Sequence, residues 1–277
     1  MFNANDLKLN VKQILAISEK ELKLHLRYGF KFALRYITPL VSIFIPYIIL
    51  AKIFSLSEAF YFDYYTEYNF LLFLLIAYCI NYMFGILNLY KETFRREKVW
   101  LTLKGLIIAP FNRFNLIVGL LITELIIIIP TITFFIIICY LLFPIPLISL
   151  LHFCSIFIAI IIIFMGIGVL IGVIDIVNED ISNLLSYSTK FISWLSCVTY
   201  PLKLFPRILQ FFIRLNPFYY IFDLLKLSWW AGIDPIDAYK YISWQHYFVL
   251  FTMTIGIPII ALWSFDRIYN RYGITGY

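Results

Sequence analysis

The sequence predicts an all-α integral membrane protein with six transmembrane helices. Hydrophobic residues make up 62% of the 277 residues and charged residues only 14%, whereas about a quarter of the residues of a soluble domain are charged. The hydrophobic residues also stand in runs long enough to cross a bilayer, which requires about 20 residues per helix. These runs are apolar on every face, unlike the alternating strands of a β-barrel.

The six runs occupy residues 34–54, 70–90, 114–143, 146–174, 181–202 and 246–265. The fifth run is the weakest because it contains Lys190 and many hydroxyl side chains. Residues 34–277 are therefore expected to form a six-span transmembrane domain. Residues 1–33 precede it as a separate segment with no signal-peptide pattern.

The N-terminal segment has the spacing of a helix that lies in the membrane interface. Leu7, Val11, Leu15, Leu22 and Leu26 fall near one helical stripe, and lysines stand elsewhere around the helix. This pattern predicts a cytosolic interfacial helix whose lysines face lipid headgroups. A frayed cytosolic arm is the alternative.

The distribution of Lys and Arg predicts the orientation. Residues 1–35 contain seven of them, residues 91–113 contain six, and residues 55–69 contain none. By the positive-inside rule, both termini and the 91–113 loop are cytoplasmic in a multi-pass protein of the cell membrane. The net charge of +6 then suits anionic membrane lipid. It does not indicate nucleic acid, because no soluble basic domain is present.

The sequence contains no motif of its own for nucleotide hydrolysis or metal chemistry. G-x-x-x-x-G-K-[ST], H-E-x-x-H and G-x-S-x-G are all absent, so no catalytic residue and no metal ligand is assigned. The four cysteines lie within predicted spans and are interpreted as small packing residues. Active transport by this chain would need energy from an ion gradient or from a partner.

Two polar features stand inside predicted spans. Hydroxyl residues recur every three or four positions along the fifth span and so share one helical face; that face either lines a transport path or forms hydrogen bonds with helices. Glu124 lies within the third span, where an ionisable group needs a partner or water; Lys190 is one possible partner. The hydroxyl residues are Ser182, Ser186, Thr189, Ser193 and Ser196.

Two further segments are neither clean spans nor ordinary loops. Residues 97–110 place Trp100, Leu103 and Ile107 on one helical face and end at Pro110, which predicts a short apolar helix on the cytosolic side. This helix either docks a soluble partner or only lies on lipid in the membrane interface. Prolines and cations break up residues 201–230, which predicts a re-entrant segment between spans five and six. The alternative for the second segment is an extracellular loop anchored by Trp229 and Trp230.

These two segments carry a resemblance to a known family. The stretch TLKGLIIAP, Thr102 to Pro110, is similar to the T-L-E-x-L-x-x-x-P segment of type-2 ABC exporter permeases, and it occupies the same loop between spans two and three. The segment with Pro201, Pro206, Asn216, Pro217 and Tyr220 resembles the family's P-x-x-x-L-P … N-P-[LF]-x-Y segment. Leu101 and Lys104 depart from the usual Gly and Glu.

The resemblance implies the membrane subunit of an ATP-binding-cassette exporter, without a nucleotide site of its own. Two copies, expected to be identical, form the translocation path, and separate ATPase subunits bind ATP and Mg²⁺. Spans two and five chiefly line the path. The hydroxyl residues fit that role independently of the resemblance, and Glu124 is assigned to the same path. The implied coupling residues are Glu97, Trp100, Thr102, Leu103, Ile107 and Pro110, and the implied outer gate contains Pro201, Pro206, Asn216 and Pro217.

Two other functional classes remain open from the sequence. An ion-coupled secondary transporter would use Glu124 to carry a proton, although the paired broken helices typical of such folds are not found in the first half of the chain. A lipid-modifying membrane enzyme would use Asp175, Glu179 and Asp180, but no His or Ser stands beside them at motif spacing. A solvated acidic turn explains these three carboxylates better.

Overall fold

The computed structural model describes residues 4–27, 29–56, 69–100 and 113–272, and within these ranges the regular structure is helical. The all-α prediction is therefore confirmed. The helices are α1 (Ala4–Arg27), α2 (Gly29–Leu56), α3 (Phe70–Met83), α4 (Gly85–Val99), α6 (Arg113–Leu142), α7 (Leu147–Val177), α8 (Glu179–Trp194), the 3₁₀ helix η1 (Leu202–Leu204), α9 (Arg207–Leu215), α10 (Pro217–Ile233), α11 (Pro235–Tyr241) and α12 (Trp244–Tyr272).

Four helical segments of the described chain are long and apolar enough to cross a membrane. They are Phe70–Val99, Phe114–Leu142, Leu147–Val177 and Trp244–Ile268, and the first joins α3 and α4. They coincide with the predicted spans two, three, four and six. At 1.5 Å per residue, each exceeds the roughly 30 Å of a bilayer's hydrocarbon core.

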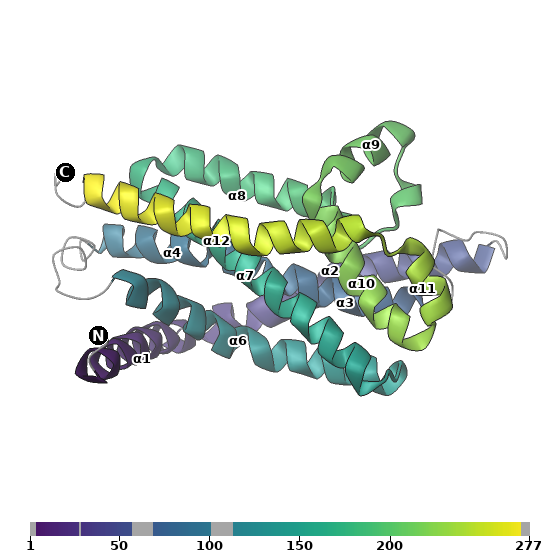
Figure 1. The fold of residues 1–277 in the computed structure, drawn as a ribbon, viewed down its shortest axis with the longest axis horizontal. Coiled ribbons are helices and arrows are strands. Elements are labelled where there is room, and N and C mark those ends of the chain that lie inside the picture. The colour runs from purple at the N-terminus through teal and green to yellow at the C-terminus, as the bar shows by residue number, and fades with distance from the viewer. Residues whose placement is uncertain (1–3, 28, 57–68, 101–112, 273–277) are drawn as a thin grey trace.

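The long helices run side by side between two ends of the molecule (Figure 1). The termini end holds the start of α1, the end of α12, the end of α4 and the start of α6. The opposite end, called here the α9–α11 end, holds α9, α11 and the loop between α6 and α7. The chain thus passes repeatedly from one end to the other, as expected for a multi-pass protein.

Helix α7 lies at the centre because its glycines admit two neighbours. A Cβ on Gly168 would lie 2.8 Å from the carbonyl oxygen of Ile86 in α4, and one on Gly172 would lie 2.7 Å from Cβ of Tyr90. On another side, a Cβ on Gly166 would lie 3.1 Å from the backbone nitrogen of Pro258 in α12. The small residues therefore allow close helix packing in the absence of a hydrophobic driving force in lipid.

The buried residues form two clusters, one towards each end. The larger cluster joins α3, α7 and α10 and includes Phe73, Phe164 and Trp229. The smaller cluster joins α4, the start of α6 and the ends of α7 and α12, and includes Tyr90 and Phe265. Between α3 and α4 the helix is interrupted at Phe84, next to Gly85, a residue of low helix propensity.

Two predicted spans differ in length from the helices observed. Span two was expected to end at residue 90, but α4 continues to Val99 because its buried residues still pack on α7. Span five was expected to reach residue 202, but α8 ends at Trp194. Leu195 caps the helix, and in the turn that follows Cys197 adopts a left-handed backbone conformation with φ of 52°.

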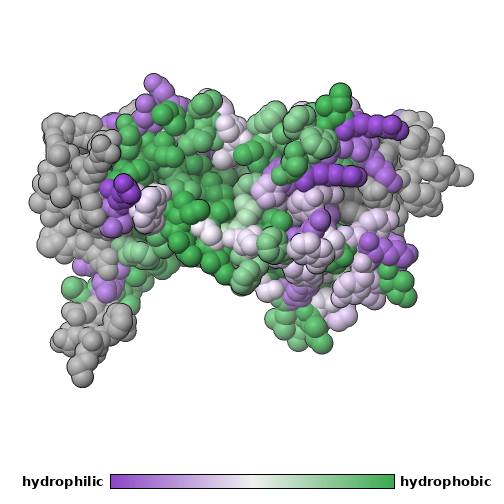
Figure 2. Space-filling view, turned by 45° about the horizontal axis from the view of Figure 1, so that its top comes forward, coloured by the Kyte–Doolittle hydropathy of each residue, from purple (hydrophilic) through white to green (hydrophobic). Residues whose placement is uncertain are grey.

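The surface has the distribution expected of a membrane protein. Figure 2 shows hydrophobic residues across the middle of one face and hydrophilic residues gathered towards the α9–α11 end. Large hydrophobic side chains are exposed along α6, α7 and α12, including Phe134, Ile148 and Phe251. Exposure of contiguous apolar surface on this scale is unusual for a soluble monomer.

Candidate coupling and translocation sites

Four charged side chains join α1 to the end of α4, and this set is called here the α1–α4 charge cluster. The Arg96 guanidinium donates to the carboxylate of Glu21, and the Lys20 ammonium donates to the carboxylate of Glu97. The Lys20 ammonium also lies 3.6 Å from Glu21. The Glu21 and Glu97 side chains are only 2% and 3% exposed, so the cluster holds two buried carboxylates with two cations.

Helix α1 approaches the rest of the molecule through its polar face. Ser18 donates from Oγ to the Gly119 carbonyl of α6 at 2.8 Å. Asn115 of α6 donates to the side-chain oxygens of Asn10 and Gln13 at 2.8 and 2.6 Å. A Cβ on Gly119 would lie 2.8 Å from the side chain of Ile17, so the glycine permits this contact.

Three residues of the apolar stripe of α1 point away from the protein, and a fourth, Leu22, is half-buried. Val11, Leu15 and Leu26 are all exposed, whereas a soluble arm would turn such residues inward. A helix that packs its polar residues on the protein and exposes its leucines is typical of the membrane interface. The contacts of α1 therefore favour the interfacial helix over a frayed arm.

A second ion pair on α1 provides a comparison. Lys23 and Glu19 lie 2.6 Å apart, one turn from each other, and both are more than half exposed. The hydrogen bond and charge of Lys23 lower the pKa of Glu19. Exposed pairs of this kind contribute little to stability, whereas the carboxylates of the α1–α4 charge cluster are buried.

The predicted coupling residues are described only in part. Glu97 belongs to the last turn of α4 and to the α1–α4 charge cluster. Trp100 caps α4, is about half exposed, and lies 5.6 Å below the Arg96 guanidinium. Thr102, Leu103, Ile107 and Pro110 lie outside the described residues.

On the other side of α4, polar side chains join it to α7 and α8. Arg95 pairs with Asp175 of α7 at 3.0 Å. The Lys91 ammonium donates to Oγ of Ser186 at 2.8 Å and to Oδ1 of Asn183 at 3.0 Å, both in α8. The end of α4 is therefore connected by charged or hydrogen-bonded contacts to α1, α7 and α8.

Three hydroxyl residues of α8 and of the turn after it bond within the chain, whereas the Ser182 hydroxyl is buried with no hydrogen-bond partner among the described residues. Ser186 donates to the Ser182 carbonyl, Thr189 to the Ser186 carbonyl and Ser196 to the Ile192 carbonyl. Ser182, Ser186 and Ser196 are buried, and Thr189 and Ser193 are half-buried. In a single copy these contacts correspond to the hydrogen-bonding alternative, and the path-lining role of this face stays a prediction.

Glu124 is fully buried in α6. Its helical neighbours Leu120, Ile127 and Ile128 are buried as well, so it points into the protein and away from lipid. The side chain of Lys190, the partner suggested by sequence, lies outside the described part of the chain.

The broken segment at the α9–α11 end is ordered by its prolines and Asn216. Pro201 precedes η1, Pro206 precedes α9, and Pro217 is the first residue of α10, where its missing N–H is not needed. Asn216 caps α10 by accepting from the Phe218 N–H and donates to Oγ of Ser196 at 2.8 Å. The structure thus brings a predicted gate residue to a predicted path residue.

Helix α10 is a core element. Residues 221–230 are all buried. Trp229 donates its indole N–H to the Phe143 carbonyl at 3.2 Å. Lys226 donates to the Cys197 carbonyl at 2.6 Å. The alternative of a flat loop anchored by Trp229 and Trp230 is therefore wrong, because interfacial anchors would be exposed.

Sequence reasoning missed the α1–α4 charge cluster and the partners of Lys91. One signal was available: Glu21 and Glu97 are acidic residues within strongly cationic segments, which is typical of carboxylates kept for internal pairing. Among the residues that the structure describes, no three His, Cys, Asp or Glu side chains are grouped so that they could hold a metal ion.

Comparison with known proteins gives the family. No curated protein matches the chain, but the ABC-2 type transporter membrane family matches residues 12–228, a range from α1 into α10. Members are transmembrane permease components that lack the nucleotide-binding domain and work with an ATP-binding-cassette ATPase. The match covers most of the helices and contacts described above, and the chain belongs to the ABC-2 type transporter family.

Proposed function

We propose that the chain is the permease subunit of an ABC exporter, that two identical copies enclose the translocation path, and that a separate ATPase subunit binds ATP and Mg²⁺ and powers transport. Family membership supports the permease role. The absence of a nucleotide-binding motif from the sequence supports a separate ATPase. The chain itself then supplies the path and the element that receives the force.

In this proposal the chain crosses the plasma membrane six times with both termini in the cytoplasm. Helices α2 and α8 are the two spans beyond the four long apolar segments. Support comes from Figure 1, where the start of α1, the end of α12, the end of α4 and the start of α6 share one end. Residues 91–113 and the N-terminal segment carry most of the cations, so this termini end is cytoplasmic by the positive-inside rule.

The main support for the proposed mechanism is the set of ion pairs that join the end of α4 to its neighbouring helices. Residues 97–110 form the coupling segment that the ATPase pushes. The push reaches α4 first. Because Glu97 and Arg96 are paired with α1, and Arg95 with α7, these helices move together at the cytosolic end. These pairs resist separation because each separation would leave a buried carboxylate without its cation.

The same proposal assigns the outer gate to the α9–α11 end. The interruption at Phe84 separates α4 from α3. The larger buried cluster contains α3 and the first turn of α4, with Ile86 and Leu87, and the smaller cluster contains α4 from Leu89 onward. Movement of the cytosolic cluster can therefore tilt α4 while α3 remains with α10. Asn216, which links α10 to the turn after α8, is the contact that changes when the outer end opens.

Co-purification tests the proposal directly. Trp100→Asp with Leu103→Asp should leave the protein inserted but abolish co-purification with its cognate ABC ATPase subunit. A matched control is Ile236→Asp with Trp244→Asp, which changes two exposed residues at the α9–α11 end. Retained ATPase binding by the first variant, or equal loss in the control, would contradict the coupling assignment.

A second candidate function rests on the complete burial of Glu124. In that alternative the chain is an ion-coupled secondary transporter, and Glu124 carries the proton. Proteoliposomes containing only this chain distinguish the two. Proton-driven uptake that is lost in Glu124→Gln would support the secondary transporter, and transport only with ATP and the ATPase would support the ABC permease.

A further inference from the structure

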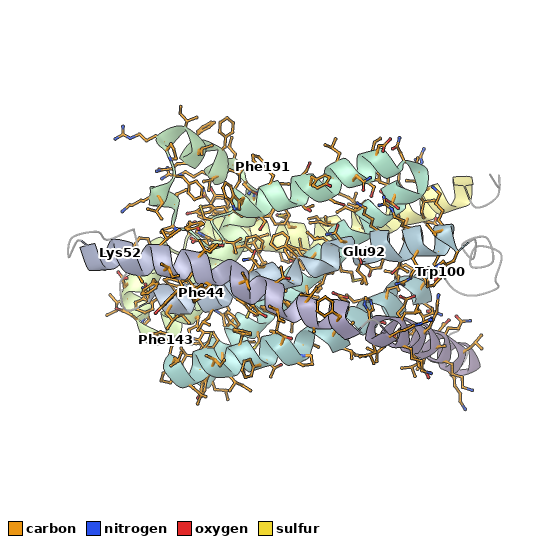
Figure 3. All side chains as sticks on the ribbon, turned by 180° about the vertical axis from the view of Figure 1, so that it is seen from behind. Phe44, Lys52, Glu92, Trp100, Phe143 and Phe191 are labelled. Carbon is orange, nitrogen blue, oxygen red and sulfur yellow. The ribbon has the colours of Figure 1, made fainter. Side chains whose placement is uncertain are left out.

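A polar stripe runs along the span formed by α3 and α4. Asn81, Asn88 and Glu92 stand at helical spacing on one side of it, with Gly85 between them, and none of these positions is buried. In the described part of the chain the side chains of Asn81, Asn88 and Glu92 make no hydrogen bond or ion pair. Figure 3 shows Glu92 on α4, in the strip between α8 and the end of α1.

The depth of this stripe excludes an ordinary lipid-facing surface. The segment Phe70–Val99 has 30 residues and is about 45 Å long, so about 7 Å at each end lies beyond the hydrocarbon core. Asn88 is about 16 Å and Asn81 about 27 Å from the cytosolic end. Side-chain amides without partners at these depths belong in a water-filled path or against another protein.

An aromatic stripe on α8 lies beside the polar stripe. Tyr187, Phe191 and Trp194 are exposed on one face of α8. Arg95 of α4 reaches Oδ1 of Asn183 in α8 at 3.3 Å, which sets the two helices side by side. One turn closer to the α9–α11 end than the Arg95–Asn183 contact, α4 carries Glu92 and α8 carries Tyr187. The two stripes therefore border the same surface, and Phe191 marks the α8 side in Figure 3.

The charges near this surface are not equivalent. Lys91 is buried and donates to Ser186 and Asn183, and Arg95 is held by Asp175. Glu92 is exposed, so its carboxylate is the charge offered to a molecule in the path. The attraction between a carboxylate and a cation is stronger where water is scarce. The faces of aromatic rings attract cations as well.

We propose that this surface binds an amphiphilic organic cation as the transported substrate, with its charge at Glu92 and its apolar body against Tyr187, Phe191 and Trp194. The proposal rests on the permease function proposed above and adds the substrate class. Asn81 and Asn88 continue the polar side of the surface towards the outer half. An anion of the same shape meets repulsion from Glu92 and from the ring faces, so the surface selects by charge.

The test uses the full chain in lipid nanodiscs, without nucleotide or ATPase. Equilibrium dialysis compares tetraphenylphosphonium with tetraphenylborate, two ions of nearly equal shape and opposite charge, against empty nanodiscs. Wild type should bind the phosphonium saturably and the borate not. Glu92→Gln should weaken phosphonium binding about tenfold or more, and Glu92→Asp should retain most of it.

Two controls keep the result interpretable. Glu19→Gln removes an exposed carboxylate on α1 and should leave binding unchanged. The melting temperature of Glu92→Gln should equal that of wild type, because the exposed Glu92 side chain has no partner to lose in the described chain. The proposal is overturned if wild type shows no saturable phosphonium binding, if borate binds equally well, or if Glu92→Gln binds like wild type.

The outcome is separable from the coupling mechanism. Binding in nanodiscs needs no ATPase, so loss of ATPase co-purification would contradict the exporter proposal without affecting the binding result. Conversely, a chain that couples to an ATPase but fails the dialysis test would retain the permease role and lose the cationic substrate.

Discussion

Replacing Glu21 by Gln is expected to loosen α1 from the end of α4. The Glu21 side chain is 2% exposed and receives the Arg96 guanidinium, which is 25% exposed. Gln keeps the shape of the side chain but removes its charge. Arg96 then loses its carboxylate, while Lys20 keeps its pairing with Glu97.

The size of the effect follows from the burial of the two partners. Removing one partner of a fully buried ion pair costs about 3–5 kcal/mol, and an exposed pair contributes about 0–1 kcal/mol. Because Glu21 is buried and Arg96 is a quarter exposed, an intermediate cost of about 2 kcal/mol is expected. That cost raises the population with α1 detached by about 30-fold.

Hydrogen exchange measured by mass spectrometry in nanodiscs reports this population. Peptides from α1 should exchange up to about 30-fold faster in Glu21→Gln, while peptides from α7 stay unchanged. Glu19→Gln removes the carboxylate of an exposed pair on the same helix and should change exchange by less than about threefold. The exchanged pair Glu21→Arg with Arg96→Glu should recover at least half of the protection.

Two results would refute this reasoning. Equal exchange of α1 in wild type and Glu21→Gln would show that the ion pair does not hold the helix. Equal acceleration by Glu19→Gln would show that any loss of charge on α1 matters, irrespective of burial.

Three further predictions concern packing and capping, each measured as thermal unfolding in detergent. Gly168→Ala should lower stability by about 1–3 kcal/mol because its Cβ would lie 2.8 Å from a backbone carbonyl of α4. The control Gly256→Ala, whose Cβ would have nothing within 4 Å, should be neutral or stabilising. Equal effects of the two changes would contradict close packing at Gly168. Asn216→Leu should lower stability by about 1–2 kcal/mol by removing the cap of α10, and a wild-type melting curve would show that the cap is dispensable. Lys226→Met should lower it by about 1–3 kcal/mol because a buried carbonyl loses its donor; an unchanged or raised melting temperature would argue against that bond.

Hydrophobic run length predicted most of the long helices. Four predicted spans reappear as long apolar segments. In lipid, the backbone N–H and C=O groups must bond within the chain, and a helix satisfies all of them. Helix ends were less predictable. The turn that follows the end of α8 at Trp194 contains Cys197, whose carbonyl accepts a hydrogen bond from Lys226, 29 residues away, and no local sequence pattern reveals such a contact.

Residue spacing predicted the face of α8 that carries hydroxyls but not what that face meets. The Ser186 hydroxyl accepts a hydrogen bond from Lys91 of α4. This contact spans 95 residues, and no periodicity reveals it. The same holds for the α1–α4 charge cluster, whose partners come from segments more than 70 residues apart. The capping role of Asn216 can be predicted from the sequence, since an Asn-Pro pair before an apolar run indicates a capped helix start.

We propose that residues 97–110 face the cytosol and receive the push of an ATPase. Photo-crosslinking tests it most directly, with benzoylphenylalanine in place of Ile107 in cells that also produce the ABC ATPase subunit. A covalent adduct between the two subunits is expected, and it should be absent when the photo-crosslinker replaces Trp244 at the opposite end. No adduct from position 107, together with labelling of a cysteine at that position by an impermeant reagent added outside intact cells, would contradict it.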